Sequence, residues 1–379
     1  MLPAPLHVTV AAARRFMRQA LLLDTPAPTV ADALAHHGYI QIDPINVCGR
    51  MHDLIARNRV AGYREGDLMR HVHGDAAILT ADQRVAFEHH LPSTGILVVF
   101  GLDAWPHLLA AMRARTKRSG AWSGRLSQRE RELAERILAE IAARGPLNSD
   151  AFNDGRNAKS AWGKATLAKS TLQKLFFHGR VLISHREGNR RFYDLPERVL
   201  PARVLAAPEP TPKETARWSG LLKLRQRRLV TLKRGEVPLV EDQVQPVRIP
   251  ACPLLYCLRA DLPLFGAAFA APPNAAPDSP RLLAPLDPLI YDRVVTSRLW
   301  AYDYTWEVYT PPHKRVRGYY ALPVLAETDI VGHINPKADR PNRKLLVVSR
   351  QIRRGHSVTA GTRQLAIFLG LRTVAITQS

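Results

Sequence analysis

The chain is poor in cysteine and contains no long hydrophobic run. Its 379 residues include three cysteines, which are too few and too scattered for a disulfide framework or a four-ligand zinc site: Cys48, Cys252 and Cys257. No apolar stretch reaches the roughly 18–20 residues of a membrane span. The N-terminal segment carries an arginine pair at amphipathic-helix spacing, which is unlike a signal peptide. A reduced, cytoplasmic protein is therefore expected.

The sequence motifs of several enzyme classes are also absent. We find no P-loop, no GxGxxG after a strand and no GxSxG elbow. Histidine occurs in four close clusters, which are His36-His37, His52-Asp53, His71-x-His73 and His89-His90. None of these clusters has the HExxH spacing of a zinc enzyme, and the chain has no CxxC. The sequence accordingly predicts neither a metal site nor a cofactor.

Acidic residues are scarce relative to basic ones. The chain has 54 Lys and Arg against 33 Asp and Glu, a formal net charge of +21, and only 11 of the basic residues are lysines. Such a balance favours a polyanionic partner, either nucleic acid or an acidic membrane surface. Arginine favours nucleic acid, because its planar fork matches phosphate and guanine edges.

Hydrophobic spacing and breakers indicate an α+β protein. We expect helices over residues 10–23, 30–37 and 44–58, with a short strand over 39–43. Farther along, Ser127 and Glu130 form a capping box. Helices are then expected from Ser127, from Ser149 and within 160–178, followed by strands 181–185 and 191–195. That order is typical of a winged helix, although other small α+β domains share it. A Pro/Ala-rich linker over 201–212, a basic stretch over 213–234 and a strand-rich region over 282–348 complete the chain.

The tripeptide Gln41-Ile42-Asp43 could carry chemistry. On a strand, residues 41 and 43 share one face, so an amide and a carboxylate would project together with Tyr39 while Ile42 enters the core. Gln41 could orient a water molecule, and Asp43 could accept its proton or stabilise a cation. The alternative is structural, because Asp followed by Pro44 suits the N-cap and first position of a helix. The two roles are compatible.

Three ordered blocks resemble one family. The stretch GYIQIDPINVCGRMHDLIARNR is similar to the Gln-hydrophobic-Asp region of YcaQ-like DNA glycosylases, which are relatives of the AlkZ enzymes that unhook DNA interstrand crosslinks. SAWGKATLAKSTLQKLFFHGRVLISHREGNRRFYDLPERVLP resembles the family's second winged helix. LLAPLDPLIYDRVVTSRLWAYDYTWEVYTPPHKRVRGYYALPVL resembles its C-terminal β region. The segment after Phe87-Glu88 departs from the family pattern.

The resemblance implies tandem winged-helix domains and a small C-terminal β-barrel-like domain, curved around a basic DNA channel. The expected domains are residues 1–125, 126–205 and 206–379, with the β-rich module at about 280–345. The implied activity is that of a monofunctional DNA glycosylase that hydrolyses the N-glycosidic bond of N7-alkylated purines, including crosslinked ones, without a metal. The expected partner is double-stranded DNA. The protein is expected to be a monomer that does not bind membranes and that lies with the nucleoid in a bacterial cytoplasm.

The resemblance also assigns residues. Gln41 and Asp43 match the catalytic motif, and Arg50 and His52 match an Arg-x-His pair that follows it in the family. Aspartate at the third motif position places the chain in the YcaQ-like branch, which implies a broader lesion range. Arg186, Arg190 and Arg191 flank the turn of the predicted hairpin, where they would touch DNA or form a solvated turn. For Arg50 and His52 the alternative is a solvated helix surface.

Two other functions fit the same composition. A non-enzymatic winged-helix regulator would also need a basic surface, but it would bind one operator tightly. An RNA-binding protein is compatible with the charge alone, although no RNA-recognition aromatic motif or GXXG loop supports it.

Overall fold

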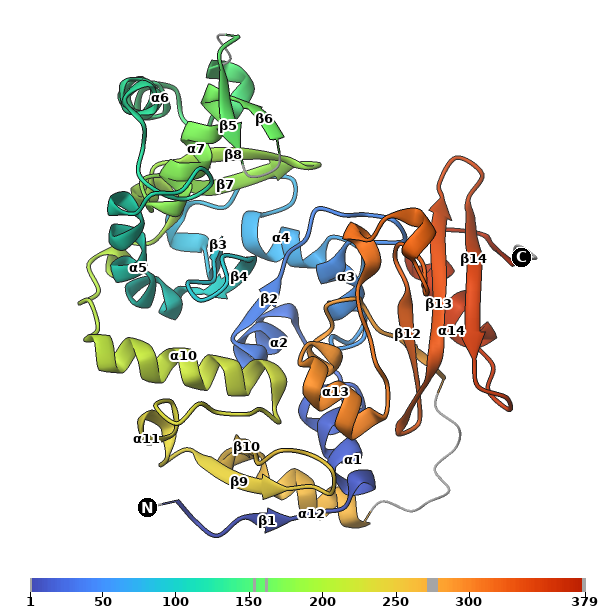
Figure 1. Ribbon diagram of the computed structural model, residues 1–379. Helices are drawn as coiled ribbons and strands as arrows, with labels where there is room; N and C mark the ends of the chain where they lie inside the picture. The colour runs from blue at the N-terminus through green and yellow to red at the C-terminus, as the bar shows by residue number, and fades with distance from the viewer. Residues whose placement is uncertain (1, 153–154, 161–162, 271–278, 377–379) are drawn as a thin grey trace. The chain divides into compact units, whose positions relative to one another are not determined.

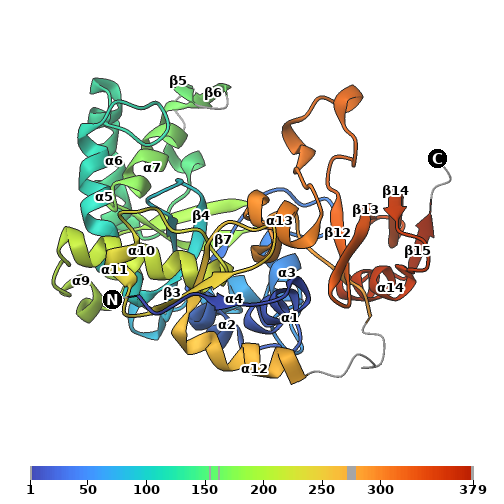
Figure 2. The same ribbon diagram turned by 60° about the horizontal axis from the view of Figure 1, so that its bottom comes forward.

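The computed structural model describes residues 2–152, 155–160, 163–270 and 279–376 (Figures 1 and 2). It is a mixed α/β structure whose chain forms two compact units, each assembled from separate stretches of sequence. Unit 1 contains Met1–Gly38, Asp43–Asp67 and Ala216–Ser379, and unit 2 contains Tyr39–Ile42 and Leu68–Thr215. A unit of this kind can hold more than one domain, so the predicted division near residues 125 and 205 stays a prediction. Within the described ranges, no helix is long and apolar enough to cross a membrane.

The first core of unit 1 surrounds α1 (Val10–Ala20). The Thr9 side chain accepts a hydrogen bond from the Ala12 N–H and caps this helix, which confirms most of the helix predicted over residues 10–23. The Phe16 ring stacks on Phe265 with 3.9 Å between ring centroids. The elements around α1 are α12, α13 and a three-stranded sheet in the order β1-β9-β10: α12 (Leu262–Ala270), α13 (Arg293–Trp300), β1 (Leu6–His7), β9 (Val244–Arg248) and β10 (Leu255–Leu258).

Helix α2 (Val30–His37) agrees with the sequence at both ends. The Thr29 side chain accepts from the Asp32 N–H, and Gly38 ends the helix at φ +82°. A left-handed residue after the last turn is the usual place for glycine. The remaining helices of unit 1 are α3 (Met51–Ala56), α11 (Val237–Val240) and α14 (Thr359–Phe368). Two helices cross between the units: α4 (Asp67–His73) lies in unit 2 from Leu68 onward, and α10 (Pro212–Arg227) lies in unit 1 from Ala216 onward.

The second core of unit 1 lies on a curled five-stranded sheet, drawn in orange and red in Figure 1. Its order is β11-β12-β13-β14-β15, antiparallel except for the parallel pair β14 and β15: β11 (Arg281–Leu282), β12 (Leu322–Ala326), β13 (Asp329–Asp339), β14 (Lys344–Ile352) and β15 (Thr373–Ile376). Helix α14 connects the two parallel strands and packs Leu365 and Ala366 against the sheet core. The sheet therefore extends well past the region predicted to be rich in strands.

The aromatic run over residues 302–309 forms no strand, contrary to its alternating pattern. It is extended chain followed by a single 3-10 turn, Glu307–Tyr309. Tyr304 is buried and donates its hydroxyl to the Ala321 carbonyl at 2.7 Å, whereas Tyr309 is 71% exposed. The run is thus partly core, and it is held by side-chain contacts rather than by a β-ladder.

Unit 2 contains the antiparallel sheet β2-β4-β3, built from β2 (Tyr39–Gln41), β4 (Leu97–Gly101) and β3 (Ala86–His90). Its helices are α5 (Trp105–Lys117), α6 (Gln128–Arg144), α7 (Leu167–Phe177), α8 (Pro196–Val199) and α9 (Ala202–Leu205). Two hairpins complete it: β5 (Asn157–Ser160) with β6 (Gly163–Thr166), and β7 (Leu182–Glu187) with β8 (Arg190–Asp194).

The predicted helix–helix–helix–hairpin order over residues 127–195 is only partly observed. Helix α6 (Gln128–Arg144) has the predicted capping box of Ser127 and Glu130, and Gly145 is its C-cap residue. The helix expected from Ser149 is one 3-10 turn, Ser149–Phe152. The third helix is shorter than expected, because residues 157–160 and 163–166 pair as strands and Thr166 caps α7; residues 161 and 162 lie outside the described part. The β7–β8 hairpin is present, but its turn is tighter than predicted and contains only Gly188 and Asn189.

Candidate active site and nucleic-acid interface

Gln41 is the last residue of β2 in unit 2. It lies opposite Val98 of β4, and the next residue, Ile42, donates its N–H to the Leu97 carbonyl at 2.9 Å. Both faces of this short strand are buried, so Tyr39 shares the interior with Ile42 instead of facing solvent. The strand ends before Asp43, so the strand spacing that predicted a common face for residues 41 and 43 does not extend to Asp43.

Asp43 begins the return of the chain into unit 1 and is half-buried. Its Oδ1 accepts the N–H of Ile45 at 2.9 Å, which is an Asx turn. Burial raises the pKa of the Asp43 carboxyl, and the Ile45 N–H partly opposes that shift. In the described residues no cation forms an ion pair with this carboxylate. A carboxylate of this kind is more basic than an exposed one and can respond to a developing positive charge.

The helix predicted over residues 44–58 is wrong for its first half. Residues 44–50 form a loop, and α3 begins only at Met51. Asp43 is therefore not the N-cap of a helix starting at Pro44. Asn46 Oδ1 accepts the Gly49 N–H at 3.1 Å, and this bond and the Asx turn offer the backbone an alternative to helical hydrogen bonds.

The same loop is held against the five-stranded sheet. The Val47 carbonyl accepts the N–H of Ala338 on β13 at 2.9 Å. Gly49 adopts φ +114°, and a Cβ at this position would lie 3.1 Å from Leu54 Cδ2. Only glycine adopts such a backbone without strain. These contacts fix the position of the loop that begins with the Asp43 carboxylate.

Tyr320 is a residue of this region that the sequence did not identify. It is fully buried, and among the described residues its hydroxyl has no hydrogen-bond partner. Burial first, then the nearby Cys48 and Asp43, raise the pKa of the phenol well above its usual value. The ring of Trp306 packs edge-on at 6.0 Å between centroids. Tyr320 thus stays protonated and places a neutral donor in the electrostatic surroundings of Asp43.

Arg50 and His52 occupy different positions at the start of α3. Arg50 is the half-buried N-cap residue. The His52 side chain is buried, with Nε2 3.7 Å from Asp53 Oδ2, so a solvated helix surface is wrong for this residue. Asp53 is itself held in the interior, because its Oδ1 accepts the Tyr63 hydroxyl at 2.6 Å and the Gly66 N–H at 3.0 Å.

The hairpin arginines of unit 2 separate into one interior and two outer residues. Arg186 Nε donates to Glu88 Oε1 at 2.5 Å, and a second N–H of Arg186 donates to Glu88 Oε2. The expectation of a solvent-facing Arg186 is therefore wrong. Arg190 is exposed, at 3.6 Å from Asp150 Oδ2, and Arg191 is half-buried and donates to Gln173 Oε1 at 3.3 Å. These two remain available as candidate phosphate contacts.

Glu88 was not singled out by the sequence. Besides Arg186, its carboxylate contacts His73 Nε2 at 2.8 Å. Burial opposes ionisation, but Arg186 and His73 outweigh it and hold the pKa of Glu88 well below its usual value. The partners lie 15 and 98 positions away, so no local pattern could have revealed them.

The paired histidines pack as core residues. The His89 ring is fully buried and contacts the Phe176 carbonyl at 2.9 Å through Nε2, and the His90 ring stacks on Phe177 at 3.6 Å. Burial lowers the pKa of His89 to about 4. Across the ranges that the structure describes, no group of three or more His, Cys, Asp or Glu residues could hold a metal ion, and the three cysteines form no disulfide.

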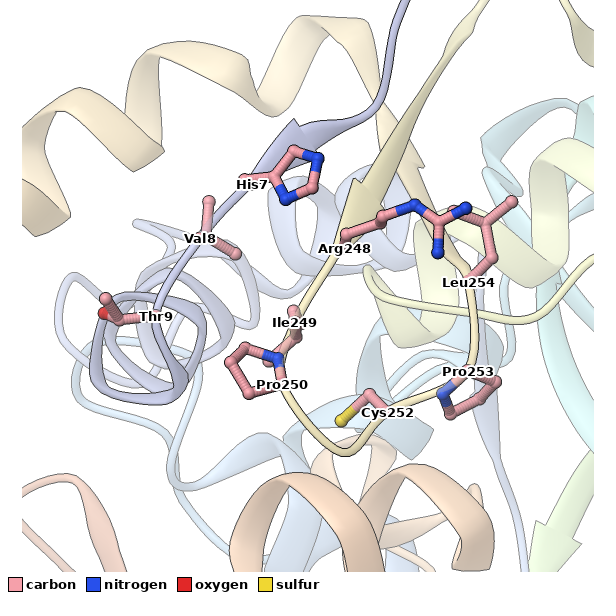
Figure 3. Close-up of a pocket in the computed structure, with 9 residues that line it drawn as sticks. All are labelled: His7, Val8, Thr9, Arg248, Ile249, Pro250, Cys252, Pro253 and Leu254. Atoms are coloured by element: carbon pink, nitrogen blue, oxygen red, sulfur yellow. The ribbon is translucent and has the colours of Figure 1, made fainter.

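A groove of about 460 Å³ lies elsewhere in unit 1 (Figure 3). His7 of β1 and Arg248 of β9 are paired residues at one end, and Cys252 lies in the turn at the other. No carboxylate lines this groove, so it lacks the acid or base that the Asp43 loop provides.

Comparisons with known proteins concern the family and the fold of the chain as a whole. A family model described as DNA glycosylase AlkZ-like matches residues 34–364, which is most of the chain. The fold is similar to that of the Streptomyces sahachiroi DNA glycosylase AlkZ, with a TM-score of 0.62 and 15% sequence identity over 98% of this chain and 100% of that chain.

Proposed function

This chain belongs to the AlkZ-like DNA glycosylase family, and on that premise we propose that it removes N7-alkylated purines from double-stranded DNA, including crosslinked ones. The reaction is hydrolysis of the N-glycosidic bond by a monofunctional enzyme. Asp43 is the central catalytic residue, and Gln41, two positions before it, orients the attacking water. The predicted membership of this family is confirmed by the family match, which gives DNA as the substrate.

The chemistry of the lesion explains why few catalytic groups are needed. An N7-alkylpurine is cationic, so the base leaves readily and no general acid is required. The transition state resembles an oxocarbenium ion, which a nearby carboxylate stabilises while it directs a water molecule. The observation that carries the proposal is the Asp43 carboxylate, which is half-buried, has no ion pair among the described residues and is held by the Ile45 N–H.

The other predicted residues take supporting roles in this proposal. Arg50 and His52 begin the helix that follows the Asp43 loop, and Tyr39 begins the strand that carries Gln41. Arg190 and Arg191 contact the phosphate backbone, whereas Arg186 maintains the hairpin through Glu88. Aspartate at position 43 also places the chain in the YcaQ-like branch, with a broad lesion range.

Single-turnover excision of N7-methylguanine from duplex DNA tests the proposal. In Asp43→Asn, the amide oxygen can still accept the Ile45 N–H, so the Asx turn and the melting temperature are retained. The charge and the base are lost, and excision slows by about 10²-fold or more. Gln41→Ala costs less, because the carboxylate remains.

Asp339→Asn is the matched control. Its carboxylate also closes a local turn, by accepting the Asn342 N–H at 3.3 Å, but it lies at the end of β13. This variant excises at the wild-type rate. If Asp43→Asn melts normally and is equally fast, the catalytic assignment of Asp43 is wrong.

A further inference from the structure

A basic surface of unit 1 lies between α14 and the strands β14 and β15. It is a cleft of about 450 Å³. Three arginines line it from three places in the chain: Arg350 on β14, Arg363 on α14 and Arg372 between α14 and β15. All three arginines are exposed. We call this surface the arginine cleft.

The cleft lies where α14 packs against the five-stranded sheet. Among the described residues, β15 pairs with β14 from Lys344 to Val347, and β14 continues to Ile352. Arg350 therefore lies on the part of β14 beyond this pairing. Figure 2 shows α14 against the same sheet. Buried apolar side chains of both elements, Val347 and Ala366 among them, line the cleft beneath the arginines.

The charges of the arginine cleft are not compensated within the described structure. None of the three arginines forms an ion pair with a described residue, and no Asp or Glu lines the cleft. Residues 340–379 contain eight Lys and Arg and no Asp or Glu. Like charges gathered around one cavity repel one another, and this repulsion is relieved when an anion binds between them.

We propose that the arginine cleft binds the phosphate backbone of double-stranded DNA, as a contact in addition to that at the lesion. This inference rests on the proposed function, which makes DNA the polyanion this chain meets. Guanidinium groups are suited to the role, because their planar forks match phosphate oxygens in two-point contacts. The contact carries no sequence information; it adds affinity and fixes orientation.

The test compares binding of an undamaged duplex over a range of salt concentrations. The variant is the triple substitution Arg350→Gln, Arg363→Gln and Arg372→Gln. Each lost phosphate contact reduces the slope of log Kd against log salt by about 0.9, so the triple variant loses about 2.7. Replacing the same three residues by lysine retains the positive charge and most of the slope.

A matched triple variant, Arg129→Gln, Arg136→Gln and Arg203→Gln, removes the same net charge from exposed arginines of unit 2 that have no ion pair among the described residues. It changes the slope by less than about 1. Equal slopes for the cleft variant and this control overturn the inference. A second result would also overturn the inference. If wild type binds polyglutamate and the cleft variant does not, while both have the same slope for DNA, the cleft binds an acidic protein.

The two proposals can fail separately. Undamaged DNA is not excised, so the salt slope does not depend on catalysis. Wild-type protein that fails to bind any duplex contradicts both the proposed function and this inference. Wild-type protein that excises N7-methylguanine, but whose cleft variant keeps the wild-type slope, contradicts this inference alone.

Discussion

Glu88 and Arg186, 98 positions apart in the sequence, form a buried two-point ion pair in unit 2. The arginine contributes both Nε and a terminal nitrogen, so each carboxylate oxygen has its own donor. Arg186 is therefore committed to the interior of its unit, although it stands only two positions before the hairpin turn at Gly188.

Removing Arg186 destabilises the protein more than removing its neighbour Arg190. Arg186→Ala leaves the buried Glu88 carboxylate without its main counter-charge, and we expect a loss of about 3–5 kcal/mol in the free energy of unfolding. Arg190→Ala costs about 0.5 kcal/mol or less, because its pair with Asp150 is exposed. Denaturant titrations measure both values. Adding Glu88→Gln to Arg186→Ala restores part of the loss; a double variant less stable than Arg186→Ala would contradict the pairing.

Because His89 is buried and neutral, the free energy of unfolding depends on pH over a defined range. The pKa of His89 is about 4 in the folded protein, against about 6.5 when unfolded. Between these pH values only the unfolded chain binds the extra proton. The contribution of His89 to the free energy of unfolding is therefore complete above about pH 6.5, and about 3 kcal/mol is lost as the pH falls toward about 4. His89→Gln weakens this dependence. Identical pH profiles for wild type and His89→Gln would refute the effect.

The excision rate depends on the ionisation of Asp43. Because burial raises the pKa of this carboxyl, the acid limb of the pH–rate profile lies above the value of about 3.9 expected for an exposed aspartate. The rate is full above the folded pKa and falls as the pH drops through it. Single-turnover excision measured at each pH shows this limb in wild type. Asp43→Asn, measured in parallel, reports the background loss of N7-methylguanine; a limb that persists in this variant would have another origin.

Chelation leaves the activity unchanged. Within the described parts of the chain no cluster of metal ligands occurs, and a cationic purine leaves without a Lewis acid. We expect the same single-turnover rate before and after dialysis against EDTA. A loss that one divalent ion restores would show that histidines of this chain assemble a site in the DNA complex.

The sequence by itself determined the features that depend on neighbours a few positions away. Thr29 and Gly38 bound α2, and Ser127 with Glu130 begins α6, because a side chain and the backbone N–H it accepts from are three residues apart. The net positive charge and the Gln-Ile-Asp motif could also be identified from the sequence, because the first depends on composition and the second on residue order.

Only the tertiary structure decided the rest. Apolar spacing after Pro44 favoured a helix, but the bonds of Asp43 to Ile45 and of Val47 to the sheet strand β13 hold a loop there instead. Arg186 is drawn inward by a carboxylate 98 residues away, and Arg350, Arg363 and Arg372 come together because α14 packs against the five-stranded sheet. The Asp43 turn is local, but the other contacts join distant segments, whose energies exceed local propensity and leave no periodic trace in the sequence.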